Sequence, residues 1–178
     1  MHSEWGRIES TDPIIEPGAI IYDECEIGDY TIIGANAVLR PRTHIGHHSI
    51  FGTLSCSEGM NRIGNYTTIH AQCHITKYVT IGDNCFIAPF FIATNTEEIT
   101  PSKAGHHGTE RADFRPKPTL IENNVRIGAN VRMIPGLTIG HHSVIDQDTL
   151  ITKNIPPYSH VRGGKDKVGK IIESIKNQ

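Results

Sequence analysis

The stretch RIGNYTTIHAQCHITKYVTIGDNCFI, from Arg62 to Ile87, carries isoleucine at every sixth position. The same register extends towards the N-terminus, interrupted only at Ser57, through Ile15, Ile21, Ile27, Ile33, Leu39, Ile45 and Phe51. After a break the spacing returns at Ile121, Ile127, Met133, Ile139, Ile145 and Ile151. A period of six is neither the period of a helix nor the alternation of one long strand. It predicts short strands separated by corners.

Two other positions of the repeat are also selected. From Ala19 to Cys85, the residue four places after each aliphatic position is small or β-branched, as at Thr31, Ala37 and Ser49. Gly, Asn or Asp often follows the aliphatic residue directly, as in Ile27-Gly28-Asp29 and Ile81-Gly82-Asp83-Asn84. We expect these residues to adopt the left-handed backbone of tight turns.

The repeat predicts a solenoid rather than a globular fold. Three hexads would make one triangular coil, so residues eighteen apart would stack, and Ile27, Ile45, Ile63 and Ile81 would form one buried column. A unit this short cannot bury its apolar face alone, so the coils must stack on one another.

This pattern resembles the hexapeptide-repeat acyltransferase family, in which an aliphatic residue is often followed by Gly and a small residue takes the fifth place. The resemblance covers roughly residues 13–163. It implies an all-β fold, the left-handed parallel β-helix, whose handedness comes from the family and not from the spacing. We expect a lead-in over residues 1–12, the β-helix domain over 13–163, and a tail over 164–178.

Two segments depart from the repeat. Residues 94–119 are polar, contain Gly105, Gly108 and several prolines, and predict a long excursion loop from one corner. In the tail, Pro156-Pro157 would stop the solenoid, and Lys167 to Lys176 places apolar residues at helical spacing. We therefore expect a short C-terminal helix that covers the open end of the core.

The composition excludes several classes of protein. The formal net charge is −2, from 17 basic and 19 acidic residues, and no basic stripe points to a nucleic-acid partner. No stretch reaches the roughly 20 apolar residues of a membrane span, and the first residues lack the apolar core of a signal peptide. We expect a cytoplasmic protein. Its four cysteines form no CxxC pair, so we expect buried thiols rather than a zinc site.

The segment KPTLIENNVRIGANVRMIPGLTIGHHSVIDQDTLITKNIPPYSHV, Lys117 to Val161, is most similar to the last coils of sugar acetyltransferases in this family. The resemblance implies transfer of an acetyl group from acetyl-CoA to a hydroxyl or amine of a sugar or a nucleotide-linked amino sugar. It also implies cofactor contacts at Gly128, Ala129, Pro135, Gly136 and Lys153. The tail departs from the family ending, and Lys165 or Lys167 could supply the positive charge for a phosphate contact there.

A general base is needed to take the proton of the acceptor, and histidine titrates closest to neutral pH. The chain has 11 histidines, so location must choose among them. The resemblance implies His106 or His107 in the excursion as the base, with Asn95 as its orienter, because the excursion of relatives reaches across a subunit boundary. His74 is the next candidate, and a base outside this set stays open.

Two other functions compete with acetyl transfer. Some similar proteins bind zinc between subunits and hydrate carbon dioxide, which requires three converging imidazoles, and His70-x-x-x-His74 is the nearest spacing here. A catalytically silent scaffold is the other alternative. We expect no metal, a small-molecule acceptor as the partner, and a homotrimer with shared sites, as the resemblance implies.

Overall fold

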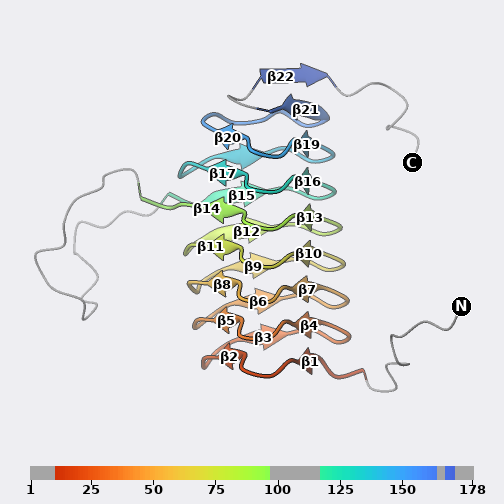
Figure 1. The fold of residues 1–178 in the computed structure, drawn as a ribbon, viewed down its shortest axis with the longest axis vertical. Helices are drawn as coiled ribbons and strands as arrows, with labels where there is room; N and C mark the ends of the chain where they lie inside the picture. Colours follow the sequence, from red (N-terminus) through yellow and green to blue (C-terminus); the bar gives the residue numbers. More distant parts are fainter. Residues whose placement is uncertain (1–10, 97–116, 164–166, 171–178) are drawn as a thin grey trace, which may run out of the picture.

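The chain folds into a triangular β-helix whose coils stack along one axis (Figure 1). The computed structural model describes residues 11–96, 117–163 and 167–170. Within these residues every regular element is a strand, and no helix is present. Successive strands run from right to left across the front of Figure 1 and return behind while the chain rises, so the coils wind left-handed. The predicted left-handed parallel β-helix is confirmed.

The strands form three parallel sheets, one on each side of the triangle. Sheet A holds nine strands: β1 (Ile14–Ile15), β4 (Ile32–Ile33), β7 (Ile50–Phe51), β10 (Thr68–Ile69), β13 (Phe86–Ile87), β16 (Arg126–Ile127), β19 (Val144–Ile145), β21 (Ser159–Arg162) and β22 (Lys167–Lys170). Only β22 pairs antiparallel, with β21.

Sheets B and C complete the triangle. Sheet B holds β2 (Ile20–Ile21), β5 (Val38–Leu39), β8 (Cys56–Ser57), β11 (His74–Ile75), β14 (Ile92–Ala93), β17 (Arg132–Met133) and β20 (Leu150–Ile151). Sheet C holds β3 (Glu26–Ile27), β6 (His44–Ile45), β9 (Arg62–Ile63), β12 (Val79–Ile81), β15 (Thr119–Ile121) and β18 (Thr138–Ile139). We call the turns between these sheets the AB, BC and CA edges.

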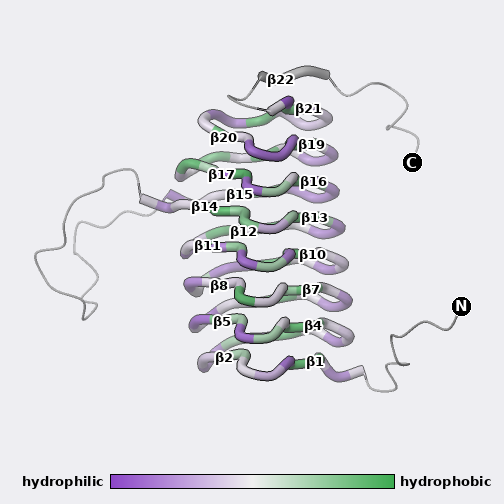
Figure 2. Tube along the Cα trace, viewed as in Figure 1, coloured by the Kyte–Doolittle hydropathy of each residue, from purple (hydrophilic) through white to green (hydrophobic). Residues whose placement is uncertain are grey.

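The inward register agrees with the period of six. Ile45, Ile63 and Ile81 pair one above another in sheet C and are at most 5% exposed. Figure 2 shows hydrophobic segments recurring at the strands and hydrophilic segments at the edges. Ile15 and Ile21, in the first coil, are 44% and 37% exposed, because no described strand lies below them. The column is therefore a core only where coils cover it on both sides.

The interruption at Ser57 is a buried polar contact. Ser57 points inward and is completely buried. Its hydroxyl lies 2.8 Å from Thr43 Oγ1 and accepts a hydrogen bond of 2.8 Å from the side-chain amide of Asn61. The three side chains satisfy one another, so the polar residue is tolerated in the core.

The small residue of each repeat links neighbouring coils. Thr31 Oγ1 donates to the carbonyl of Gly46 at 2.7 Å and accepts from the amide of Ser49 at 3.1 Å. Ser49 repeats the arrangement with Gly64 and Thr67 one coil further on. A hydroxyl at this position satisfies the buried backbone of the next coil.

Glycine is required in the repeat for a reason other than the expected left-handed backbone. The left-handed residue is the third of each turn and recurs every six residues, as at Tyr30, Asn36 and Tyr66, with φ of 52° to 67° for the non-glycine residues. Gly28 and Gly64 are not among the residues of positive φ. A Cβ on Gly28 would lie 2.5 Å from the backbone nitrogen of His47, so close approach of the next coil requires glycine.

The C-terminal segment corrects the prediction of a helix from Lys167. Residues 167–170 form strand β22, and the Cα of Val168 pairs with that of Val161. Backbone pairing with the exposed edge of β21 replaces helix formation there. Residues 171–178 lie outside the described part of the chain, as do residues 97–116 of the predicted excursion.

Candidate active site

The candidate site residues that the structure describes lie on the outer face of sheet B and along its two edges. Its outward side chains form one column from Ile20 to Leu150, with His74 in the middle, between Cys56 below and Ile92 above. Gly128 and Ala129 lie at the AB edge on one side of sheet B, and the remaining described candidates at the BC edge on the other: Asn95, Pro135, Gly136 and Lys153. The repeat thus places residues distant in sequence around one face.

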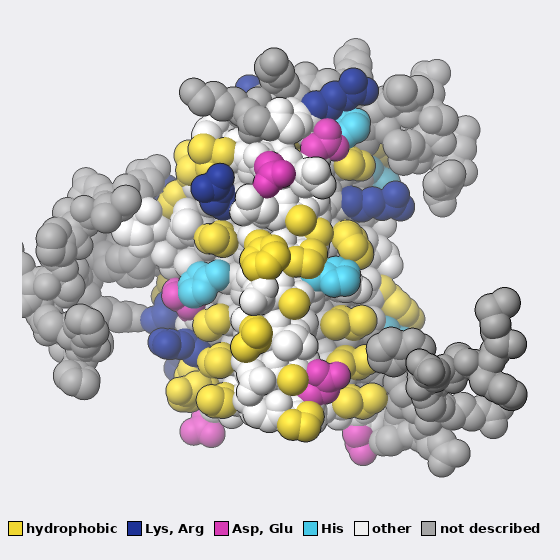
Figure 3. Space-filling view, in the orientation of Figure 1, with side chains coloured by type: hydrophobic (Ala, Val, Ile, Leu, Met, Phe, Trp, Pro, Cys, Tyr) yellow, Lys and Arg dark blue, Asp and Glu magenta, His cyan; other side chains and the backbone are white. Residues whose placement is uncertain are grey.

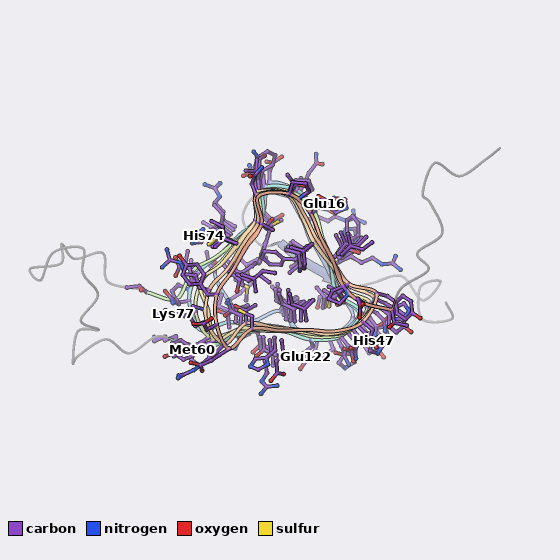
Figure 4. The ribbon with its side chains drawn as sticks, turned by 90° about the horizontal axis from the view of Figure 1, so that it is seen from below. Glu16, His47, Met60, His74, Lys77 and Glu122 are labelled. Carbon is purple, nitrogen blue, oxygen red and sulfur yellow. The ribbon has the colours of Figure 1, made fainter. Side chains whose placement is uncertain are left out.

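His74 forms a pair with a carboxylate that the sequence analysis missed. His74 Nε2 lies 3.0 Å from Glu58 Oε1, and the two side chains are 44% and 34% exposed. His74 projects from the side of the triangle between the edges marked by Glu16 and Lys77 in Figure 4. The separation of 16 residues, two fewer than one coil, is the sequence signal that could have identified Glu58.

The pair shifts both groups towards their charged forms. The hydrogen bond to Glu58 raises the pKa of His74 above its ordinary 6.5, against the opposing effect of burial. The same hydrogen bond lowers the pKa of the Glu58 carboxyl below its ordinary 4.5. A carboxylate accepts only from a protonated nitrogen, so neutral His74 carries its proton on Nε2 and its lone pair on Nδ1. Nδ1 is therefore the basic atom.

Asn95 lies where the chain leaves the solenoid. It is 9% exposed, its amide nitrogen donates to the Lys77 carbonyl at 3.3 Å, and its Oδ1 accepts from Thr96 at 3.1 Å. The amide of Lys117, where the chain returns, donates to the Asn95 carbonyl at 3.3 Å. The side chain of Asn95 thus contacts Lys77 in the preceding coil and Thr96 where the chain departs. Its backbone carbonyl contacts the chain where it returns at Lys117.

Three predicted residues cannot be placed. His106 and His107 lie in residues 97–116, and Lys165 lies in residues 164–166, all outside the described part of the chain. The proposed roles of the two histidines and of the lysine stay predictions.

The predicted cofactor residues divide between two edges. A Cβ on Gly128 would lie 2.5 Å from Gln147 N, so coil stacking alone accounts for this glycine. Pro135 is buried, and Gly136 has φ of 73° with Lys117 packed beside it. Ala129 is half-buried and Lys153 is exposed. Within one chain, Gly128 and Lys153 are separated by the width of sheet B.

A depression on sheet A adjoins Gly128. Its volume is about 320 Å³, and its lining includes the apolar residues Phe86, Ile127 and Val144 and two charged residues, Arg126 and Asp146. A second depression, lined by Asp146, Gln147, Asp148 and Gly163, continues it along the AB edge. Apolar residues beside a few charged and polar groups are typical of a site for a small molecule.

The other described histidines are held in structural contacts. His44 Nδ1 lies 2.8 Å from Glu26 Oε2 on sheet C, and His160 Nε2 lies 2.7 Å from Asp146 Oδ1. His48 stacks between Tyr30 and Tyr66 at the CA edge, with ring centroids 4.6 and 4.9 Å apart. Among the described residues, no three His, Cys, Asp or Glu side chains are grouped so that they could hold a metal.

The face on which sheets A and B meet is rich in exposed apolar side chains (Figure 3). Leu54 and Phe90, both at the AB edge, are 54% and 50% exposed. Other large apolar residues exposed on these sheets are Ile14, Ile20, Ile50 and Phe86. The described part of the chain contains no helix that could cross a membrane.

Comparison with known proteins agrees with this architecture. The family model described as bacterial transferase hexapeptide (six repeats) matches residues 11–41 and 62–90. The model described as hexapeptide repeat of succinyl-transferase matches residues 118–153. Together the two models match more than half of the chain.

Curated relatives share most of the chain at moderate identity. The galactoside O-acetyltransferase of Escherichia coli is 32% identical over 128 residues, which cover 72% of this chain and 57% of that protein. The bifunctional protein GlmU of Listeria welshimeri is 26% identical over 163 residues, which cover 82% of this chain and 35% of that protein. The chain therefore spans about half or less of the length of these relatives.

Solved structures share the fold at low identity. AntD, an N-acyltransferase from Bacillus cereus in complex with dTDP-4-amino-4,6-dideoxyglucose and coenzyme A, aligns with a TM-score of 0.61 and 14% identity, covering 94% of this chain and 88% of AntD. The acetyltransferase domain of PglB from Neisseria gonorrhoeae, in complex with acetyl coenzyme A, gives a TM-score of 0.54 and 17% identity, covering 90% and 58%. The repeat, the coils and these matches together establish that the chain belongs to the hexapeptide-repeat transferase family.

Proposed function

We propose that the protein is an acetyltransferase that moves the acetyl group of acetyl-CoA to a hydroxyl or amine of a sugar or nucleotide-linked amino sugar. The observation that carries this proposal is the His74–Glu58 pair on the outer face of sheet B, within a member of a transferase family. The names of the relatives support the acetyl group and the sugar acceptor.

His74 is the described residue best suited to act as the base. Glu58 holds the imidazole by Nε2, which leaves the lone pair of Nδ1 to accept the proton of the acceptor. The carboxylate of Glu58 stabilises the imidazolium that forms, as in other paired catalytic histidines. His74 then returns this proton to the departing thiolate, so no net proton is lost.

Acetyl-CoA, when bound, supplies the acetyl group as an activated thioester. The depression beside Gly128 is our candidate site for this cosubstrate. Phe86, Ile127 and Val144 offer apolar contacts and Arg126 a positive charge for phosphate, while the nearby carboxylate of Asp146 is paired with His160. Lys153 on the BC edge, and Lys165, are further candidates for phosphate contacts. In this proposal His106 and His107 remain alternative bases, with Asn95 as their orienter.

A homotrimer would bring these parts together. The exposed apolar side chains of sheets A and B, Leu54 and Phe90 among them, form a surface that a second copy of the chain can cover. Packing the sheet A side of one copy near the BC edge of the next would join Gly128 of one subunit to residues such as Lys153 of another. We place the assembled enzyme in the cytoplasm.

The experiment is a screen of sugars and sugar nucleotides with acetyl-CoA, in which release of free coenzyme A thiol is measured. The expected result is thiol release that depends on the acceptor and is lost in His74→Ala. Coenzyme A affinity, measured by calorimetry, should stay nearly unchanged in that variant. Coenzyme A binding without transfer to any acceptor would favour a scaffold, and absence of both would refute the proposal.

A further inference from the structure

Two pairs of adjacent histidines on the CA edge take no part in the proposed reaction. His47 and His48 lie in the turn between β6 and β7, and His141 and His142 lie in the equivalent turn between β18 and β19. His47 marks this corner of the triangle in Figure 4, across the prism from sheet B. Each pair follows a glycine and precedes a serine, so the sequence GHHS occurs twice on one edge.

In both pairs the two imidazoles meet through their Nδ1 atoms. His47 Nδ1 lies 2.9 Å from His48 Nδ1, and the Nδ1 atoms of His141 and His142 are also 2.9 Å apart. Each contact is a hydrogen bond when one ring carries its proton on Nδ1, because a neutral imidazole has one donor and one acceptor nitrogen. Moving that proton to Nε2 makes the lone pairs of both Nδ1 atoms available to one ligand.

Neighbouring coils hold the second histidine of each pair. His48 and His142 have left-handed backbones, with φ of 54° and 57°. The ring of His48 stacks on Tyr66, and that of His142 stacks on Tyr158, each with ring centroids 4.9 Å apart. Both histidines remain exposed, so a ligand can reach them. A ring that is already held by packing loses little freedom when it binds, which favours chelation.

The separation of 2.9 Å matches two nitrogen ligands of one metal ion. With metal–nitrogen bonds of about 2.0–2.1 Å, two nitrogens at an angle of about 90° lie about 2.9 Å apart, whereas the tetrahedral angle of Zn²⁺ requires about 3.3–3.4 Å. Angles near 90° are typical of tetragonal Cu²⁺, which also has the highest affinity among the divalent ions of its row. The geometry therefore favours Cu²⁺ over Zn²⁺.

The two pairs differ in the charge beside them. The amide of His141 donates to Glu122 Oε2 at 2.8 Å, whereas the amide of His47 donates to the neutral Oδ1 of Asn65 at 3.0 Å. A negative charge nearby stabilises a bound dication. Within the described residues no third His, Cys, Asp or Glu side chain joins either pair as a ligand, so water would complete the coordination.

We propose that each histidine pair binds one Cu²⁺ ion through its two Nδ1 atoms, and that His141–His142 binds it more tightly than His47–His48. The ion replaces the proton shared by the two rings, and this proton moves to Nε2 of the same imidazole, so the charge of the protein itself does not change. Both sites lie on the edge opposite sheet B and are independent of the proposed acetyl transfer.

The test is a titration of the metal-free protein with Cu²⁺, followed by calorimetry and by electron paramagnetic resonance. The copper spectrum of the wild type should show splitting from two imidazole nitrogens. His141→Ala/His142→Ala should bind one ion fewer than wild type and lose the tighter site. His47→Ala/His48→Ala should lose the weaker one. These differences remove the contribution of histidines elsewhere in the chain, and His44→Ala, on sheet C, is the control that should retain the wild-type stoichiometry.

Two further measurements test the choice of metal and the ranking of the sites. Zn²⁺ should bind more weakly than Cu²⁺ at both pairs. Glu122→Gln should weaken the tighter site about 10-fold, the lower end of the usual cost of losing an outer-sphere partner, and leave the other unchanged. An unchanged tight site in Glu122→Gln would refute the ranking of the two pairs.

Three results would overturn the inference as a whole. They are the same copper stoichiometry in wild type and both double variants, spectra without two nitrogen ligands, and Zn²⁺ bound as tightly as Cu²⁺. Release of coenzyme A thiol, measured without added metal, should be the same in wild type and in all these variants. The copper sites and the proposed acetyl transfer can therefore fail separately.

Discussion

His74 Nε2 lies 3.0 Å from Glu58 Oε1 on the outer face of sheet B, and this contact joins strand β11 to the residue that follows β8 in the preceding coil. A second His–Glu contact, His44 with Glu26 at 2.8 Å, has the same chemistry on sheet C. The two pairs differ in their surroundings, because only His74 lies between the two edges that carry the candidate cofactor residues. The chain thus contains its own control for a catalytic histidine.

Replacing His74 with Ala should lower turnover by about 10²- to 10⁴-fold, the usual contribution of a positioned general base. His44→Ala should leave turnover within about 2-fold of wild type, because its imidazole lies on another face of the prism. Steady-state kinetics at saturating acetyl-CoA measures both. A large loss in the double variant His106→Ala/His107→Ala, with His74→Ala fully active, would move the base to the excursion.

Replacing Glu58 with Gln should shift the pH profile of kcat/KM. Glu58 raises the pKa of His74, so removing its negative charge lowers that pKa. Neutral His74 then persists to lower pH, and the acidic limb of the kcat/KM profile should shift to lower pH. Glu26→Gln is the matched control and should leave the profile in place. An unchanged acidic limb in Glu58→Gln would show that Glu58 does not affect the protonation of the catalytic base.

Replacing Ile81 with Asp should unfold the protein or lower its stability by at least about 3 kcal/mol, because an unpaired carboxylate would be buried between coils. Ile81 is 1% exposed and stacks on Ile63 and Ile121. Thr80→Asp, on the same strand but facing outwards, should cost little. Thermal unfolding followed by circular dichroism compares them, and equal shifts would contradict the inward register.

Replacing Gly128 with Ala should destabilise the protein by about 1–3 kcal/mol even without cofactor, the usual cost of overpacking. The new Cβ would lie 2.5 Å from Gln147 N, a backbone atom. Gly163→Ala is the control, since its Cβ would come no closer than 3.7 Å to the Gln147 carbonyl. A loss of coenzyme A affinity at unchanged melting temperature would instead assign Gly128 to the cofactor.

Replacing Phe90 with Asp should dissociate the proposed trimer. Phe90 is 50% exposed at the AB edge, where a second copy would bury it, and a carboxylate there would be desolvated without a partner. Leu120→Asp, at an exposed apolar position on sheet C, should leave assembly unchanged. Light scattering coupled to size exclusion measures the mass. A wild-type monomer at micromolar concentration would contradict both the trimer and the shared site.

The sequence alone determined the fold, because its period of six repeats a local rule in every coil. Each inward aliphatic residue must be covered by the coil above and below, so the spacing from Ile33 to Ile151 specifies the stacking without any distant information. The period alone did not show why glycine is required at these positions. The period shows that glycine recurs at the position of Gly28. Only the tertiary structure shows that a side chain on Gly28 would collide with the backbone of His47 in the next coil.

The conformation of the tail and the His74–Glu58 contact were decided by tertiary structure. Helical spacing after Lys167 was overridden because the free edge of β21 offers backbone partners to residues 167–170. His74 was a candidate in the sequence, but Glu58 was not, since a separation of 16 residues becomes a contact of 3.0 Å only after one coil has closed. The repeat fixes which residues face outwards, whereas the coil geometry decides which of them meet.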